Sequence, residues 1–257
     1  MTQLLRLEAQ KLWHLTSLRF SLVLFLVFPL LWAYAPGIFN VYGFFVVSGF
    51  QVPGLVLRSS MEFLLPLLVA IASAELFGLE INYGTLRTIL LRPVSRGQWL
   101  TAKALLCCFY PFVLVYMLLA LSLLAGVFAG YGPFQGGTGV GASGLVGFGT
   151  MLPGDAFVEL VRAYTIAACS LIPIGLLALL GSVLLMRAGA GALAALAVLI
   201  VVRLLVVFPR LEPFLLTSQL DAYLRASQGV GPSLLYIFIH ALVFATAAVL
   251  IFDRKDV

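Results

Sequence analysis

Apolar residues dominate this chain in long runs, and polar or charged residues are largely confined to the segments between them. Runs of about twenty apolar residues have the length that an α-helix needs to cross a bilayer, whereas strands of a membrane barrel alternate over about ten positions. The pattern therefore predicts an all-α integral membrane protein. We place its six transmembrane helices at residues 17–35, 62–81, 103–129, 164–186, 189–208 and 233–252.

Composition agrees with this class and excludes others. Of 257 residues, 63% are hydrophobic and 10% are charged, against about 25% charged residues in soluble domains. The net charge of +5 does not indicate a nucleic-acid partner, because the cations lie at the ends of spans and not along one face. Cys107, Cys108 and Cys169 lie in apolar segments without the spacing of metal ligands, so we interpret them as small core residues.

The residues before the first span repeat with the period of an amphipathic helix. Arg6 and Lys11 lie on its polar half, whereas Glu8 is an exception to the pattern. Trp13 is placed at the level of the lipid headgroups. We therefore predict an interfacial elbow helix over residues 1–16 that lies along the membrane. A helix that binds a cytoplasmic partner is a compatible alternative.

Charge fixes the predicted orientation. Six spans put both termini on one side, and that side carries ten lysines and arginines against four on the other. Because positive charge accumulates on the cytoplasmic side, both termini are predicted to be cytoplasmic. Segments 130–156 and 209–232 are then extracytoplasmic. Glu212-Pro213 fits the start of a helix in the second of them.

The longest charged interruption runs from residue 80 to residue 103. Gly84-Thr85 predicts a break, and Thr85 can cap a short helix that Pro93 ends. Ser95 can cap a second helix that continues into the third span. The interruption carries four cations, Arg87, Arg92, Arg96 and Lys103.

The order of these residues resembles a segment in the membrane subunit of type 2 ABC exporters, the ABC-2 family. In that family the segment is a cytoplasmic coupling element that docks on a separate ATPase subunit. The resemblance implies such an element at residues 82–102 and an elbow helix that borders the ATPase through Arg6, Lys11 and Trp13. It also implies short outer re-entrant helices between spans five and six. The coupling residues would be Glu80, Gly84, Thr85, Leu86, Arg87, Arg92, Pro93 and Arg96.

The resemblance implies one transmembrane domain, residues 1–257, that serves as the permease of an ATP-driven exporter. Its partners would be two copies of an ABC ATPase, a second permease chain (identical or similar) and the lipid bilayer. Its location would be the cytoplasmic membrane of a bacterium or archaeon. We expect no catalytic site and no cofactor in this chain, with ATP and Mg bound by the partner. A phosphate loop needs Gly-Lys, and the lysines follow Gln10, Ala102 and Arg254.

Ionisable residues within spans are candidates for function. Glu75 and Arg203 are interpreted as possible pathway residues, although Arg203 can also extend to the membrane surface. Glu80 is expected to pair with Arg87 or Arg92 and so to fix the coupling element to the second span.

Two other functions compete with export. An ion-gradient-driven secondary transporter is the alternative, but the chain has no convincing internal repeat. An intramembrane protease is least favoured: Gly141-Ala142-Ser143-Gly144 resembles the rhomboid nucleophile motif with His240 as base, yet no full span can start there before Pro153. The apolar spans favour a hydrophobic or amphiphilic cargo.

Overall fold

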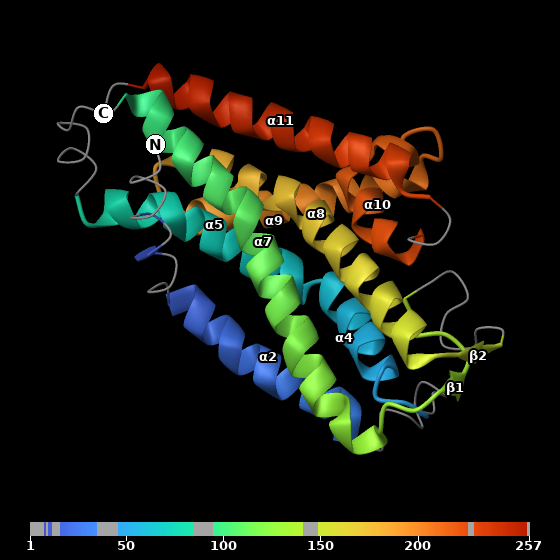
Figure 1. Cartoon of the computed structure of the whole chain (residues 1–257). Helices are drawn as coiled ribbons and strands as arrows, with labels where there is room; N and C mark the ends of the chain where they lie inside the picture. Colours follow the sequence, from blue (N-terminus) through green and yellow to red (C-terminus); the bar gives the residue numbers. More distant parts are fainter. Residues whose placement is uncertain are drawn as a thin grey trace.

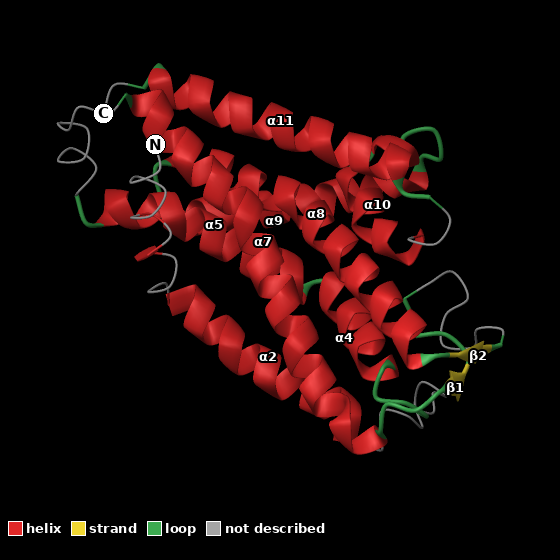
Figure 2. Cartoon of the chain, in the orientation of Figure 1, coloured by secondary structure: helices red, strands yellow, loops and turns green. Residues whose placement is uncertain are grey.

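The computed structural model describes residues 8, 10–11, 16–34, 46–84, 95–140, 149–225 and 229–255. Most of the predicted elbow helix, with Arg6 and Trp13, lies outside these ranges, as does the stretch 85–94 of the predicted coupling element. The described part is mostly helical (Figure 2) and contains one short antiparallel strand pair.

Long helices build the bundle, and within the described ranges six of them are long and apolar enough to cross a membrane. This confirms the predicted six-span, all-α architecture. The shorter helix α4 lies inside the bundle (Figure 1). In chain order the six long helices and α4 are α2 (Thr16–Tyr34), α4 (Gln51–Met61), α5 (Leu64–Asn82), α7 (Arg96–Gly126), α8 (Pro153–Leu185), α9 (Ala188–Leu204) and α11 (Gly231–Asp253).

Two spans begin earlier than predicted. Helix α7 starts at Arg96 because Ser95 caps it, as the sequence suggested, in a capping box with Gln98. Helix α8 starts at Pro153, where a proline fits the first helical turn because the N–H it lacks is not needed there. The first turns of α8 bury small and apolar residues such as Ala156 on one side, and this side was not recognised in the sequence.

Helix α4 was not predicted, and it changes the start of the second span. The chain turns at Glu62 and Phe63 between α4 and α5, so α5 begins at Leu64. Nine of the eleven α4 residues are buried. The Gln51 side chain accepts hydrogen bonds from the N–H groups of Val47 and Ser48 at its start.

Short elements connect the spans at the end of the bundle where α5 begins (Figure 1). Between α9 and α11 they occupy the position of the predicted outer helices, and Glu212–Phe214 starts at the expected Glu-Pro pair. Whether these helices re-enter the membrane stays a prediction. The short elements are η1 (Val127–Ala129), β1 (Phe134–Gln135), β2 (Thr150–Met151), η2 (Leu205–Val207), η3 (Glu212–Phe214), α10 (Leu216–Leu220) and η4 (Asp221–Arg225).

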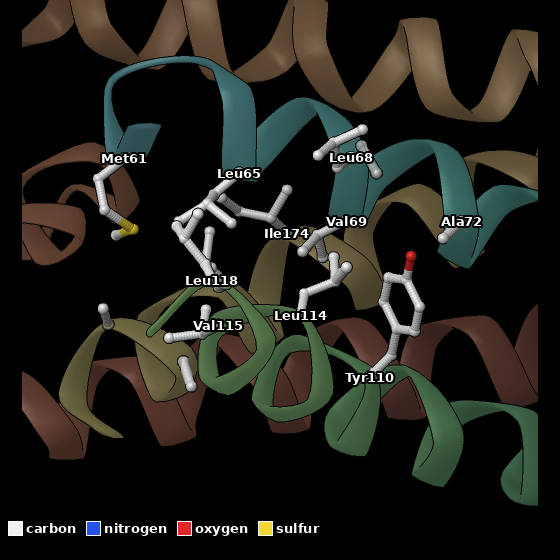
Figure 3. Close-up of a cluster of buried hydrophobic side chains, with 14 of the residues drawn as sticks. Met61, Leu65, Leu68, Val69, Ala72, Tyr110, Leu114, Val115, Leu118 and Ile174 are labelled. Atoms are coloured by element: carbon white, nitrogen blue, oxygen red, sulfur yellow. The ribbon is translucent and has the colours of Figure 1, made fainter. Parts of the chain in front are cut away.

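The core is centred on α8, which contacts α5, α7, α9 and α11. Figure 3 shows apolar side chains of α5 and α7 pointing toward one another, with Ile174 of α8 beside them. Where α8 meets α9, glycines allow the two backbones to approach closely, as small residues do in membrane helix pairs. A Cβ atom on Gly191 would overlap the Ser182 Oγ atom and lie 2.5 Å from the Ser182 backbone nitrogen.

We predict that Gly191→Ala destabilises the protein by about 1–3 kcal/mol, because α9 must move away from α8 to admit the methyl group. Gly189→Ala is the matched control on the same helix, since nothing lies within 4 Å of the position that its methyl group would take. Denaturant unfolding in detergent measures both variants. Equal stabilities would contradict the close approach.

Candidate functional site

Four charged side chains from three segments meet at one end of the bundle. Glu80 lies in the last turn of α5, Lys103 lies two turns into α7, and Glu8 and Lys11 come from the N-terminal segment. The Lys103 Nζ atom is 2.9 Å from Glu8 Oε2 and 3.1 Å from Glu80 Oε1. The Lys11 Nζ atom is 2.7 Å from Glu8 Oε1 and 2.6 Å from Glu80 Oε1. We call these four residues the ion cluster.

The ammonium group of Lys103 is the centre of the ion cluster and is fully buried. Besides the two carboxylates, it donates to the backbone carbonyl of Leu76 on α5. It also lies 4.7 Å from the ring centroid of Trp99, one turn earlier on α7, where a cation–π attraction operates. An ammonium group has three N–H donors, and these partners satisfy it without water.

Burial and charge act in opposite directions on the N-terminal members. Burial alone raises the pKa of the Glu8 carboxyl, but the charge of Lys103 and hydrogen bonds from both lysines outweigh it and hold the pKa below its ordinary value of 4.5. Burial likewise lowers the pKa of the Lys11 ammonium, yet Glu8 and Glu80 hold it above its ordinary value of 10.5. Both groups therefore stay charged over the neutral range.

Aromatic side chains pack beside the ion cluster and connect α11 to α5 and α7. The rings of Phe77 on α5, Trp99 on α7 and Phe252 on α11 pack together with centroid separations of 5.4–5.7 Å. The Arg96 guanidinium donates to the Lys255 carbonyl at 2.7 Å. The Lys255 ammonium in turn donates to two carbonyls at the end of α8, at 2.7 and 2.8 Å. This end of the bundle is thus held together across four helices.

The described edges of the predicted coupling element are well defined. Helix α5 ends before Gly84, whose φ of 66° is the left-handed conformation that glycine adopts readily after a helix. On the other edge the Ser95 side chain accepts from the Gln98 N–H at 3.2 Å, and the Gln98 side chain accepts from the Ser95 N–H at 3.4 Å. The predicted break at Gly84 and the predicted cap at Ser95 are both confirmed.

The structure brings some predicted residues together and leaves others apart. Glu80 and Lys11 meet in the ion cluster, whereas Arg96 lies at the edge of the element and contacts the C-terminal segment. The predicted pairing of Glu80 with Arg87 or Arg92 stays a prediction. Seven predicted residues lie outside the described ranges: Thr85, Leu86, Arg87, Arg92, Pro93, Arg6 and Trp13.

Sequence reasoning missed Glu8 and Lys103. Glu8 was an exception in the amphipathic pattern, and it proves to be 3% exposed at the side chain and paired with both lysines. Lys103 was counted as one surface cation among four. The sequence shows that Glu8 and Lys103 have opposite charges and that each stands among apolar neighbours. That pattern does not indicate that the two residues pair with each other.

The remaining candidates are not members of the ion cluster. Glu75 is half-buried on α5, and one of its carboxylate oxygens has no hydrogen-bond partner among the described residues. Arg203 lies near the end of α9, at the opposite end of the bundle.

The Nδ1 atom of His240 is 2.7 Å from the Tyr236 carbonyl of its own helix, and Ser143 lies outside the described ranges. The three cysteines are free, with Cys107 fully buried in the core.

Comparison with known proteins gives one family. The profile of a family described as ABC-2 family transporter protein matches residues 4–184, which include the ion cluster and both edges of the predicted coupling element. A search of curated proteins finds no match.

We predict that Lys103→Met destabilises the protein by about 3–5 kcal/mol, because it removes the buried ammonium group that contacts both Glu8 and Glu80. Adding Glu80→Gln leaves one carboxylate (Glu8) and one ammonium group (Lys11) in the ion cluster. The stability loss of the double variant should therefore be smaller, by about 0.5–3 kcal/mol, than the sum of the losses of the two single variants. Denaturant unfolding in detergent measures this difference. Lys103→Met with Glu212→Gln is the control, because Glu212 lies in η3 at the opposite end of the bundle, and the two losses should be additive. If both pairs of substitutions prove additive, the proposed coupling is excluded.

The ion cluster also predicts a pH profile. Since the pKa of Glu8 is lowered on folding, its contribution is present above pH 4.5 and is lost as the pH falls through the lower folded value. Since the pKa of Lys11 is raised, its contribution is present below pH 10.5 and is lost as the pH rises through the higher folded value. In the double variant Glu8→Gln/Lys11→Gln, the unfolding free energy measured in detergent should depend less on pH at both the acidic and the alkaline extreme. An unchanged profile would argue against these shifts.

Proposed function

The chain belongs to the ABC-2 family of transporter proteins, and we propose that it is the membrane-spanning permease of an exporter driven by a separate ATPase. The family and the six membrane-spanning helices make it a multi-pass membrane subunit of a transporter. The proposal adds the source of energy, the direction of transport and the route by which force reaches the spans.

Energy would come from a partner. The sequence contains no Gly-Lys pair, which the usual phosphate loop requires. We propose that two copies of an ABC ATPase bind ATP and Mg and dock on residues 82–102 and on the elbow segment 1–16. The positive-inside count supports a cytoplasmic location for both surfaces.

The observation that carries the proposal is the ion cluster. It joins the end of α5, the start of α7 and the N-terminal segment, which are the elements that flank or border the proposed docking surfaces. Separating these elements would leave a charge buried without its partner, at a cost of several kcal/mol. A displacement imposed on residues 85–94 is therefore expected to move α5 and α7 as a unit.

The outer surface of the bundle supports pairing with a second permease chain. In their most apolar windows only 11% of α11 and 22% of α9 are buried within the chain. Lipid covers such faces in a monomer, and a second copy or a similar chain can cover part of them in a dimer. Two chains would then enclose a pathway for a hydrophobic or amphiphilic substrate.

Glu80→Gln tests the proposal in vesicles that contain the chain and its ATPase. We predict that the protein folds and that ATP hydrolysis continues, while transport per ATP falls at least about tenfold, because α5 loses its ion pairs with Lys11 and Lys103. Asp253→Asn is the control, since Asp253 is an exposed carboxylate at the end of α11 outside the ion cluster.

Wild-type transport by Glu80→Gln would remove the coupling role. Transport by the wild-type chain without any ATPase would instead favour the ion-gradient-driven alternative.

A further inference from the structure

A polar cavity of 460 Å³ lies at the end of the bundle opposite the ion cluster. Its lining comes from the turn between α4 and α5, from the end of α9 and from the short helices η3, α10 and η4. Helix α5 runs between the two sites and, with 19 residues, separates them by about 28 Å. The cavity is therefore distinct from the proposed coupling site, and its volume is in the range of about 300–1,000 Å³ that is typical of small-ligand sites.

The charges around the cavity balance. Three guanidinium groups and three carboxylates line it, so its formal charge is zero. In the part of the chain that the structure describes, none of them forms an ion pair within 4.0 Å, in contrast to the members of the ion cluster. The six residues are Arg58, Glu62, Arg203, Glu212, Asp221 and Arg225.

Neighbouring groups make the cavity suitable for a polar ligand. The Oγ1 atom of Thr217 is buried at the cavity and has no hydrogen-bond partner among the described residues. Burial raises the pKa of the Asp221 carboxyl, while the charges of Arg203 and Arg225 act to lower it. The Asp221 side chain is exposed at the cavity and lies near two cations with which it forms no ion pair among the described residues. A ligand between these groups would satisfy both signs of charge.

We propose that this cavity binds a zwitterionic phosphate headgroup of the phosphoethanolamine type. The planar guanidinium fork matches two phosphate oxygens, and no carboxylate among the described residues forms an ion pair with these arginines. The carboxylates can accept from the ammonium group of the same ligand. Because the site has equal numbers of positive and negative groups, it favours a zwitterion over a phosphate with net negative charge.

The proposal does not depend on ATP-driven export. A phosphodiester of ethanolamine can reach the cavity as the headgroup of a membrane lipid or as a soluble zwitterion such as glycerophosphoethanolamine, and both offer the same chemistry. Failure of the coupling experiment would leave this site untouched, and failure of headgroup binding would leave the coupling role untouched.

Native mass spectrometry of the purified chain in detergent tests the site with two lipids of equal acyl chains, phosphatidylethanolamine and phosphatidylglycerol. We expect the wild-type protein to bind phosphatidylethanolamine about tenfold more tightly, and Arg203→Gln to weaken that binding about tenfold. Asp221→Asn should remove the preference between the lipids. Arg210→Gln is the matched control, since Arg210 is an exposed arginine just after η2 that does not line the cavity.

Equal affinity of the wild-type protein for the two lipids would overturn the proposal, and so would equal effects of Arg203→Gln and Arg210→Gln. Arg225→Gln replaces Arg203→Gln if that variant does not fold. Soluble glycerophosphoethanolamine identifies the source: competition with the lipid supports headgroup recognition alone, whereas lipid binding without competition supports a site that also needs the acyl chains.

Discussion

The interaction on which the rest of this structure depends is the burial of the Lys103 ammonium. An ion taken out of water loses several kcal/mol of solvation unless charges and hydrogen bonds of the protein replace it. Here the replacement comes from two carboxylates on different segments, Glu8 and Glu80, and from a backbone carbonyl of α5. None of these groups belongs to α7 itself. The chain can therefore bury this lysine only when α5, α7 and the N-terminal segment are assembled together.

The two ends of the bundle use charge differently. At one end, opposite charges are in contact and largely buried, which favours a single arrangement of the helices. At the other end, six charges surround a cavity without contacting one another in the described part of the chain. We propose that the contacts at the first end transmit force and that the separated charges at the second end are available to a ligand. Helix α5 connects both, since Glu80 lies in its last turn and Glu62 lies just before its start.

The sequence predicted the features that depend on the membrane or on local turn chemistry. The spans follow from helix length and apolar composition, and the edges at Gly84 and Ser95 follow from glycine conformation and helix capping. Features that depend on tertiary contact were missed. Helix α4 has too few apolar residues for a span and is buried only because other helices cover it. Glu8 did not fit the amphipathic pattern of the N-terminal helix. That pattern separates side chains that face lipid from those that face water, and it cannot reveal a buried ion-pair partner such as Lys103.

We propose that the ion cluster makes the end of α5, the start of α7 and the N-terminal segment one mechanical unit. The most direct measurement is a pair of experimental structures of the chain with its ATPase, one in the resting state and one with bound nucleotide. We expect Lys103 to stay in contact with Glu8 and Glu80 in both states, while the unit moves relative to α9 and α11. Breaking of these ion pairs, with α5 and α7 moving separately, would contradict it.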